Sequence, residues 1–372
     1  MKISYCNPIM YTSNFHIRNY ESSNKLEGEV SWRSPSNIAL IKYWGKHGNQ
    51  LPCNPSLSFS LKNSFTETTL EYGAAKGEHP KLQYFFEGKH EVSFEAKVKK
   101  FVKNIDEYFP FLKHTDLNIN SHNTFPHSSG IASSASSMSA LALCFCSIER
   151  KHYKSLQDDQ TFYRKASFIA RLGSGSASRS VYEGFSVWGK NKLISNSSDL
   201  FAIPLLSKTG DQLSKLKDYI LLVDSGSKEV SSTAGHALMK GHPFADARFE
   251  QANKNLEKIL TAIEEDNWND FAGITENEAL SLHAMMMTSN PSYILLKPNT
   301  LQIIEKIKQA RKQKALSVCF TIDAGPNVHL IYPERESRKV RAFIEKELLE
   351  FCSNRQGIED EMGSGPLQLN KK

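Results

Sequence analysis

The sequence lacks the features of membrane-spanning and secreted proteins. None of its apolar runs approaches the roughly 18 uninterrupted residues that cross a bilayer, and residues 138–146, an apolar run of about half that length, indicate a buried helix. Residues 1–26 are polar, with no apolar centre of the kind that a secretory signal needs. We therefore expect a cytoplasmic protein.

Cysteine is scarce and shows no metal-ligand spacing. Two of the six thiols lie inside the apolar run, where cysteines usually pack as small hydrophobic groups, and a cytosolic chain keeps its thiols reduced. His283 lies on a helical segment without a second ligand four residues on, so core packing explains it better than zinc. We expect six reduced, structural cysteines: Cys6, Cys53, Cys144, Cys146, Cys319 and Cys352.

Other site signatures are also missing. No Gly-x-Ser-x-Gly motif in a strand-turn-helix setting supports a serine hydrolase, since the nearest match begins at Gly173, follows a helix and has Ala177 in the last position. The net charge of +6 is modest and the lysines are spread along the chain, which supports a nucleic-acid surface only weakly. A local positive pocket for an anionic metabolite fits the same charge equally well.

The length of 372 residues suggests two domains or one large one. Alternating apolar residues predict strands from residue 27 onward, among them residues 90–96, and then a helix over 97–108. Helices are expected over 132–150, 159–172, 244–265, 268–287 and 301–314, with a strand-turn-strand over 317–333. This α+β pattern, with a polar linker at 190–217, predicts an irregular arm (1–26), a first domain (27–210) and a second (211–372).

Two loops rich in serine and glycine could hold anions. Residues 126–136 (PHSSGIASSAS) lead into the N-terminus of a helix, whose free N–H groups attract phosphate, although a capped turn is the commoner meaning of such a loop. It is not the common P-loop, because no Gly-Lys-Ser/Thr follows. Residues 173–180 (GSGSASRS) could bind an anion through N–H groups, hydroxyls and Arg179; a flexible connection with Arg179 in solvent is the alternative.

Two further segments place charged side chains after buried strands. Residues 34–46 deliver Lys42, Tyr43 and Lys46 at the end of an apolar strand, where they could neutralise a diphosphate or merely decorate a strand edge. Asp323 precedes an Ala-Gly-Pro-Asn turn and could act as a base or hold a charge in a cleft. An aspartate in this position is otherwise a common turn former.

Together and in this order, the four segments closely resemble the diphosphomevalonate decarboxylase family, within the superfamily of small-molecule (GHMP) kinases. The resemblance extends over about 320 residues, from 31 to near 351, and residues 37–46 and 173–179 are its most specific parts. It implies an α+β, two-domain GHMP-kinase fold with a ribosomal-protein-S5-like N-terminal domain and a ferredoxin-like C-terminal domain. It further implies ATP and Mg²⁺ as cofactors, 5-diphosphomevalonate as substrate and a homodimer.

The resemblance also implies a role for each matching residue. Asp323 would face the tertiary hydroxyl of the substrate, with Lys42 beside it and Arg179 on the carboxylate. The implied substrate-binding residues are Tyr43, Trp44, Lys46, Ser174, Ser176, Arg179, Ser231 and Ser232. The implied ATP-binding residues are Pro126, Ser129, Gly130, Ala132, Ser133 and Ser134, with Ser134 also on the metal.

The implied activity is ATP-dependent decarboxylation of 5-diphosphomevalonate to isopentenyl diphosphate. Alternatives within the same family are a decarboxylase of the monophosphate and a mevalonate 3-kinase, which tends to lose part of the Asp, Lys and Arg set that this chain keeps. A catalytically inactive binding protein would be expected to have lost the carboxylate or the phosphate loop. His47, where arginine is frequent, and His236, where methionine is expected, are departures on the diphosphate side.

Overall fold

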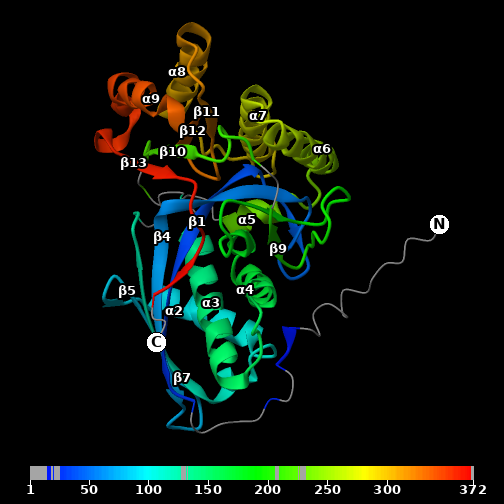
Figure 1. Cartoon of the computed structure of the whole chain (residues 1–372), viewed down its shortest axis with the longest axis vertical. Coiled ribbons are helices and arrows are strands. Elements are labelled where there is room, and N and C mark those ends of the chain that lie inside the picture. The colour runs from blue at the N-terminus through cyan, green and yellow to red at the C-terminus, as the bar shows by residue number, and fades with distance from the viewer. Residues whose placement is uncertain are drawn as a thin grey trace, which may run out of the picture.

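The computed structural model describes residues 15–17, 20, 26–126, 131, 133–205, 209–224, 226 and 232–369. An eight-stranded sheet with its helices forms the larger domain, and a four-stranded sheet with its helices forms the smaller one (Figure 1). The mixed α/β, two-domain organisation expected from the sequence is confirmed.

The large sheet is built around two long antiparallel strands, β1 (Gly28–Ile41) and β4 (Ser56–Ala74). Its main order is β14-β1-β4-β7-β5-β6. Strand β8 pairs with the first residues of β4, and β9 pairs with β8. A short hairpin of β2 (Lys46–His47) and β3 (Leu51–Pro52) lies between the long strands in the chain. The remaining strands are β5 (Leu82–Phe86), β6 (Lys89–His90), β7 (Thr115–Asn123), β8 (Phe185–Trp188), β9 (Ala202–Pro204) and β14 (Leu367–Gln368).

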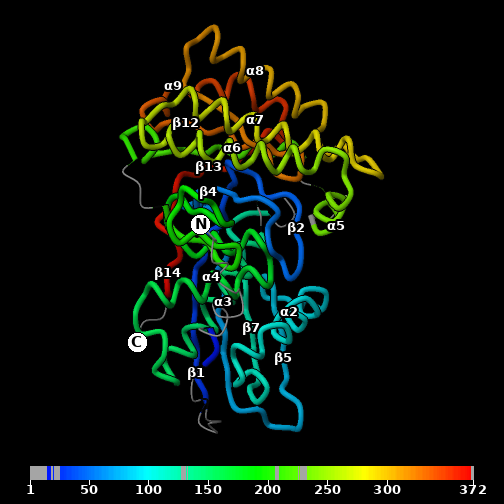
Figure 2. The backbone as a smooth tube through the Cα atoms, turned by 90° about the vertical axis from the view of Figure 1, so that its right-hand side faces the viewer, coloured from blue at the N-terminus to red at the C-terminus, as the bar shows by residue number. Residues whose placement is uncertain are grey.

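Helix α3 (Ser133–Tyr153) packs on β1 and β4, and α4 (Asp159–Gly173) packs on α3 (Figure 2). From Ala135 to Glu149, every residue of α3 except Ser137 and Met138 is buried, which agrees with the apolar run seen in this part of the sequence. The predicted strand over 90–96 is wrong, because α2 (Val92–Ile105) begins there. The Glu91 side chain caps its first turn, and Val98, Phe101 and Ile105 are buried at helical spacing.

The N-terminal segment contacts the core where the structure describes it. Phe15 is 3% exposed and stacks on Phe168 of α4, with ring centroids 4.6 Å apart. Ile17 and Leu26 are also buried in the same hydrophobic cluster. These residues are therefore anchored to the larger domain, although we expected a loose arm from the lack of periodicity.

The smaller sheet has the antiparallel order β11-β12-β10-β13. Its strands are β10 (Leu216–Leu221), β11 (Cys319–Thr321), β12 (Val328–Pro333) and β13 (Gly357–Glu361). The helices of this part are α5 (Ser232–Ala237), α6 (Ala245–Glu264), α7 (Trp268–Met287), α8 (Pro298–Lys314) and α9 (Ser337–Phe343). Helix α7 has the bounds expected from the sequence.

A buried hydrophobic cluster joins the two domains. It combines residues of β1, β4 and β8 with residues of β10, α6 and α7. Asp360 of β13 adds a polar link, since its Oδ1 accepts the backbone N–H groups of Lys62 and Asn63 in β4. The hydroxyl of Thr321 donates to the carbonyl of Ala39, so the ends of β11 and β1 meet at this interface.

Candidate active site

A buried ion pair lies where β1 and β11 end. The ammonium of Lys42 is 2.6 Å from Oδ1 of Asp323, which comes from a position 281 residues later in the chain. Lys42 is 1% exposed, whereas the Asp323 side chain keeps 27% of its surface accessible. Burial lowers the pKa of Lys42, and the neighbouring Asp323 charge offsets part of this effect. The carboxylate can therefore meet a ligand, and the lysine supports it from behind.

Arg179 lies deep in the same region. It is 3% exposed, its Nε donates to Oδ1 of Asn37 at 3.3 Å and its Nη1 donates to the hydroxyl of Ser56. Burial lowers its pKa to about 10, and the nearby negative charge of Asp323 offsets part of this effect. The guanidinium thus stays protonated, and the alternative of a solvent-exposed arginine on a flexible loop is excluded.

The loop that carries Arg179 packs closely against Tyr43. Residues Gly175–Arg179 form a short 3₁₀ helix after α4. A Cβ atom on Gly175 would lie 2.9 Å from atoms of Tyr43 and Trp188, so this position accepts only glycine without displacement of a ring. The Tyr43 hydroxyl is buried and has no hydrogen-bond partner among the described residues. An oxygen of a bound anion would satisfy it.

The N-terminus of α3 opens next to this loop. The Ser134 side chain is exposed in the first turn, and its hydroxyl is 3.3 Å from that of Ser174. A helix of 21 residues directs its free N–H groups and positive dipole end at this point. Ser133 is half-buried beside it and Pro126 is exposed, whereas Ser129, Gly130 and Ala132 lie outside the described residues.

The segment after β1 contacts α5 from the second domain. His236 accepts the backbone N–H of Gly45 through Nδ1 at 3.0 Å, and its ring centroid is 4.3 Å from that of Tyr43 and 4.5 Å from that of Trp44. Burial lowers the pKa of His236 to about 3, so the ring is neutral and Nδ1 can accept. Gly235 permits the contact, because a Cβ there would come within 2.6 Å of Trp44.

Two implied substrate residues of this segment have different surroundings. Trp44 is 4% exposed and packs with Met239 and Met286, and its contact with substrate stays a prediction. Lys46 is half-buried, donates to Oε1 of Gln50 at 2.8 Å and has a pKa lowered by burial. Ser176 is half-buried in the Arg179 loop, whereas Ser231 and the side chain of Ser232 lie outside the described residues.

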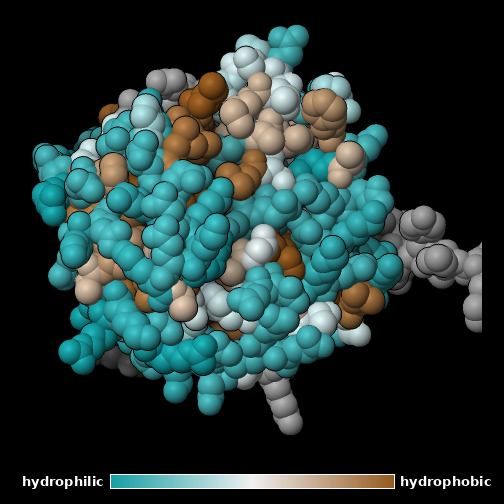
Figure 3. Space-filling view, turned by 90° about the horizontal axis from the view of Figure 1, so that it is seen from above, coloured by the Kyte–Doolittle hydropathy of each residue, from teal (hydrophilic) through white to brown (hydrophobic). Residues whose placement is uncertain are grey.

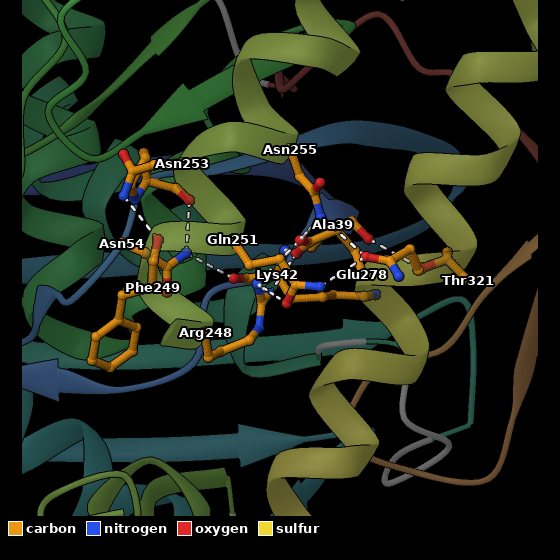
Figure 4. Close-up of polar contacts among 12 residues, drawn as sticks. Ala39, Lys42, Asn54, Arg248, Phe249, Gln251, Asn253, Asn255, Glu278 and Thr321 are labelled. Carbon is orange, nitrogen blue, oxygen red and sulfur yellow. Dashed lines mark hydrogen bonds and ion pairs between the residues drawn. The ribbon is translucent and has the colours of Figure 1, made fainter. Parts of the chain in front are cut away.

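The sequence did not reveal the residues that hold the Lys42–Asp323 ion pair in place. Glu278 of α7 accepts the backbone N–H of Lys42 at 2.9 Å, and His283 of the same helix contacts the carbonyl oxygen of Asp323 at 3.1 Å. Figure 4 shows Glu278 beside Lys42, Arg248 and Asn255. A carboxylate one or two turns before a histidine on a helix is common in any protein, so no sequence signal distinguishes them. The expectation that His283 is buried is confirmed.

Some exclusions made from the sequence can be checked over the described part of the chain. There, no helix is both long and apolar enough to cross a membrane. The same residues contain no group of three or more His, Cys, Asp or Glu side chains that could hold a metal ion. Cys53, Cys144, Cys146, Cys319 and Cys352 are unpaired thiols, and Cys6 lies outside the described residues.

Comparison with known proteins identifies the family. Residues 34–200 match the model of the diphosphomevalonate decarboxylase-like N-terminal domain, and residues 219–367 match the model of the mevalonate 5-diphosphate decarboxylase C-terminal domain. The chain belongs to the diphosphomevalonate decarboxylase family. Curated relatives include the diphosphomevalonate decarboxylases of Candida albicans and Saccharomyces cerevisiae. Each is 31% identical over 85% of this chain, and the matches cover 88% and 81% of the relatives.

Solved structures of the diphosphomevalonate decarboxylase family share the fold. The complex of MDDEF with MVAPP, AMPPCP and magnesium superposes with a TM-score of 0.79 at 28% identity, covering 93% of this chain and 100% of that one. The mevalonate diphosphate decarboxylase of Legionella pneumophila has a TM-score of 0.74 at 30% identity, covering 88% and 99%. The family resemblance inferred from the four motifs is therefore confirmed.

Proposed function

We propose that this chain catalyses the ATP-dependent decarboxylation of 5-diphosphomevalonate to isopentenyl diphosphate, with release of ADP, phosphate and CO₂. The observation that carries the proposal is the convergence of Lys42, Asp323 and Arg179 at the interface of the two domains. Relatives that bear the name of this activity, and a relative bound to MVAPP with AMPPCP and magnesium, support it.

The first step we propose is phosphorylation of the tertiary hydroxyl. The half-exposed Asp323 carboxylate orients or deprotonates this hydroxyl, whose oxygen attacks the γ-phosphorus of ATP in line. The Lys42 ammonium, 2.6 Å from Asp323, offsets negative charge that develops on the transferred phosphoryl group. ADP leaves, and the hydroxyl has become a phosphate ester.

The second step we propose is fragmentation. Phosphate departs with the electron pair of its bond to C3, and the bond between the carboxylate carbon and C2 supplies the electrons of the new double bond as CO₂ is released. Arg179 holds the carboxylate through its planar fork and must not overstabilise it, because the negative charge is consumed. The buried, unpartnered hydroxyl of Tyr43 would donate to an oxygen of the same substrate.

The residues at the start of α3 fit a nucleotide with Mg²⁺. The free N–H groups of the helix and the hydroxyls of Ser133 and Ser134 would contact the phosphates, and Ser134 would also reach the metal. Mg²⁺ usually relies on phosphate oxygens and water with one or two protein ligands, which agrees with the lack of a carboxylate cluster among the described residues. When bound, the ion would neutralise charge on the phosphates.

One assay tests the proposed activity. Purified protein with Mg·ATP is given mevalonate, 5-phosphomevalonate or 5-diphosphomevalonate, and ADP and CO₂ are measured together. We expect equal amounts of both products with the diphosphate alone. Equal release with the monophosphate would change the substrate, and ADP without CO₂ would make the protein a kinase.

His236 offers a prediction about the diphosphate side of the site. In His236→Phe the ring contacts with Tyr43 and Trp44 can persist, but the N–H of Gly45 loses its acceptor. A buried unsatisfied donor costs about 1–3 kcal/mol of folding stability. Because Gly45 lies between Tyr43 and Lys46, displacement of this segment should also raise KM for the phosphorylated substrate while KM for ATP stays unchanged. His236→Asn keeps an acceptor near the position of Nδ1 and should restore most of the affinity. Equal KM values in wild type and His236→Phe would show that this contact has no part in binding.

We further propose a cytoplasmic homodimer, with the domain boundary near residue 210. Strand β9 of the large sheet ends at Pro204, and the next strand in the chain, β10 of the small sheet, begins at Leu216, which supports this boundary.

Exposed apolar residues support the proposed dimer. They gather toward one side of the face in Figure 3, and Leu280, Met287, Ile294 and Leu301 of the second domain are exposed. Exposed apolar side chains of this kind support a subunit interface. Light scattering on the purified protein would measure the mass.

A further inference from the structure

Glu278 is a carboxylate with unusual surroundings. It lies on α7, is 0% exposed and accepts from Arg248 at 3.1 and 2.5 Å and from the amide of Asn255 at 2.7 Å (Figure 4). Its third donor is the backbone N–H of Lys42 at 2.9 Å. A buried carboxylate is costly unless it is paired and hydrogen-bonded, and here the guanidinium neutralises its charge.

The contact with Lys42 occurs where the backbone leaves the sheet. Strand β1 ends at Ile41, so the N–H of Lys42 needs a partner outside the strand. The carbonyl oxygen of Lys42 accepts from the side-chain amide of Asn54 at 3.0 Å. The backbone of Lys42 is thus held by a side chain on each side, which limits where its ammonium can lie.

The same helix reaches the partner of Lys42. Nε2–H of His283, five residues after Glu278, donates to the carbonyl oxygen of Asp323 at 3.1 Å. The His283 ring is nearly fully buried, and burial lowers its pKa to about 4, so it is neutral. Asp323 follows β11 in a turn, where its backbone has left the sheet as well.

We propose that α7 positions the Lys42–Asp323 pair for catalysis, with Glu278 fixing the backbone of Lys42 and His283 fixing that of Asp323. This inference rests on the proposed function. Neither residue touches the substrate in this scheme, so both are positioning residues. A displacement of reacting groups by about 1 Å can lower the rate 10²-fold. The two contacts from α7, one to Lys42 and one to Asp323, set the separation between the ends of β1 and β11.

The alternative is a purely structural role, in which Glu278 and Arg248 form an ion pair that only stabilises the fold. Replacing both partners of a buried pair by apolar residues is often neutral or favourable for stability, whereas removing one partner leaves a buried charge. The double variant Glu278→Leu/Arg248→Met therefore removes the acceptor of Lys42 without a lone charge. His283→Phe removes the other contact and keeps the ring, and His283→Gln retains a donor.

The experiment compares kcat, KM and Tm of these variants with wild type. We expect the Glu278/Arg248 double variant to lose about 10²-fold in kcat with KM little changed. Tm should fall only modestly, because no buried charge is left unpaired and the N–H of Lys42 is the group that loses its acceptor. His283→Phe should also lower kcat, and His283→Gln should recover most of it. The matched control is Glu276→Leu/Arg311→Met, which removes a neighbouring ion pair between α7 and α8 that contacts neither Lys42 nor Asp323 and should keep wild-type kcat.

The outcomes separate the inference from the proposed function. Wild-type kcat in both the double variant and His283→Phe, with an active wild type, would overturn the inference alone. A fall in kcat that matches a fall in Tm and appears equally in the control would also overturn it, because the effect would then be structural. A wild type that releases neither ADP nor CO₂ would refute the proposed function and with it the inference.

Discussion

Replacing Asp323 with asparagine is expected to lower kcat for ADP and CO₂ release by about 10²- to 10⁴-fold, the usual contribution of a general base, while KM changes little. The amide keeps the size of the side chain but cannot take a proton or balance the charge of Lys42, 2.6 Å away. Burial already lowers the pKa of that lysine, so loss of the carboxylate lowers it further. Steady-state assays of both products measure the effect.

A double-mutant cycle separates the two members of this pair. If they act as one unit, Asp323→Asn and Lys42→Gln should together cost scarcely more than either alone. Asp246→Asn, an exposed position on α6, serves as the control and should match wild type. Unchanged turnover in a folded Asp323→Asn protein would remove the carboxylate from the mechanism.

The second large effect is expected for Arg179→Lys. The ammonium keeps the charge but cannot donate in a planar fork to a carboxylate, and the contacts with Asn37 and Ser56 lose their donor. We expect kcat/KM for the acid substrate to fall by roughly 10²-fold, as when one donor to a developing charge is removed. Substrate titrations at fixed ATP measure this ratio.

Its matched control lies on the neighbouring helix. Arg164 of α4 is half-buried beside the ring of Phe201, outside the site. Arg164→Lys should therefore retain wild-type kcat/KM. If Arg179→Lys also behaved like wild type, the substrate carboxylate would have to be bound by other groups.

Much of the fold could be predicted from local patterns. The helix at Trp268–Met287 followed from periodicity, because burial of one face repeats in the sequence. The strand end before Lys42 followed from the apolar run over residues 38–41, but that this run continues the alternating segment from residue 27 as one strand was not foreseen. The strand expected at residues 90–96 was wrong, since a few alternating residues at a helix start resemble a strand until the cap at Glu91 is known. The packing of Phe15 on Phe168 had no periodic signal at all.

By itself, the sequence determined the family and the identity of the groups that carry charge. Residues 37–46 and 173–179 are each contiguous, so their spacing is visible without a structure. Only the tertiary structure decided how these groups meet: Lys42 with Asp323 across 281 residues, and Glu278 with the backbone of Lys42 across 236. It also decided that Arg179 is buried and that Trp44 packs in the core. Burial and long-range pairing depend on how the two domains pack, and no local pattern in the chain encodes that packing.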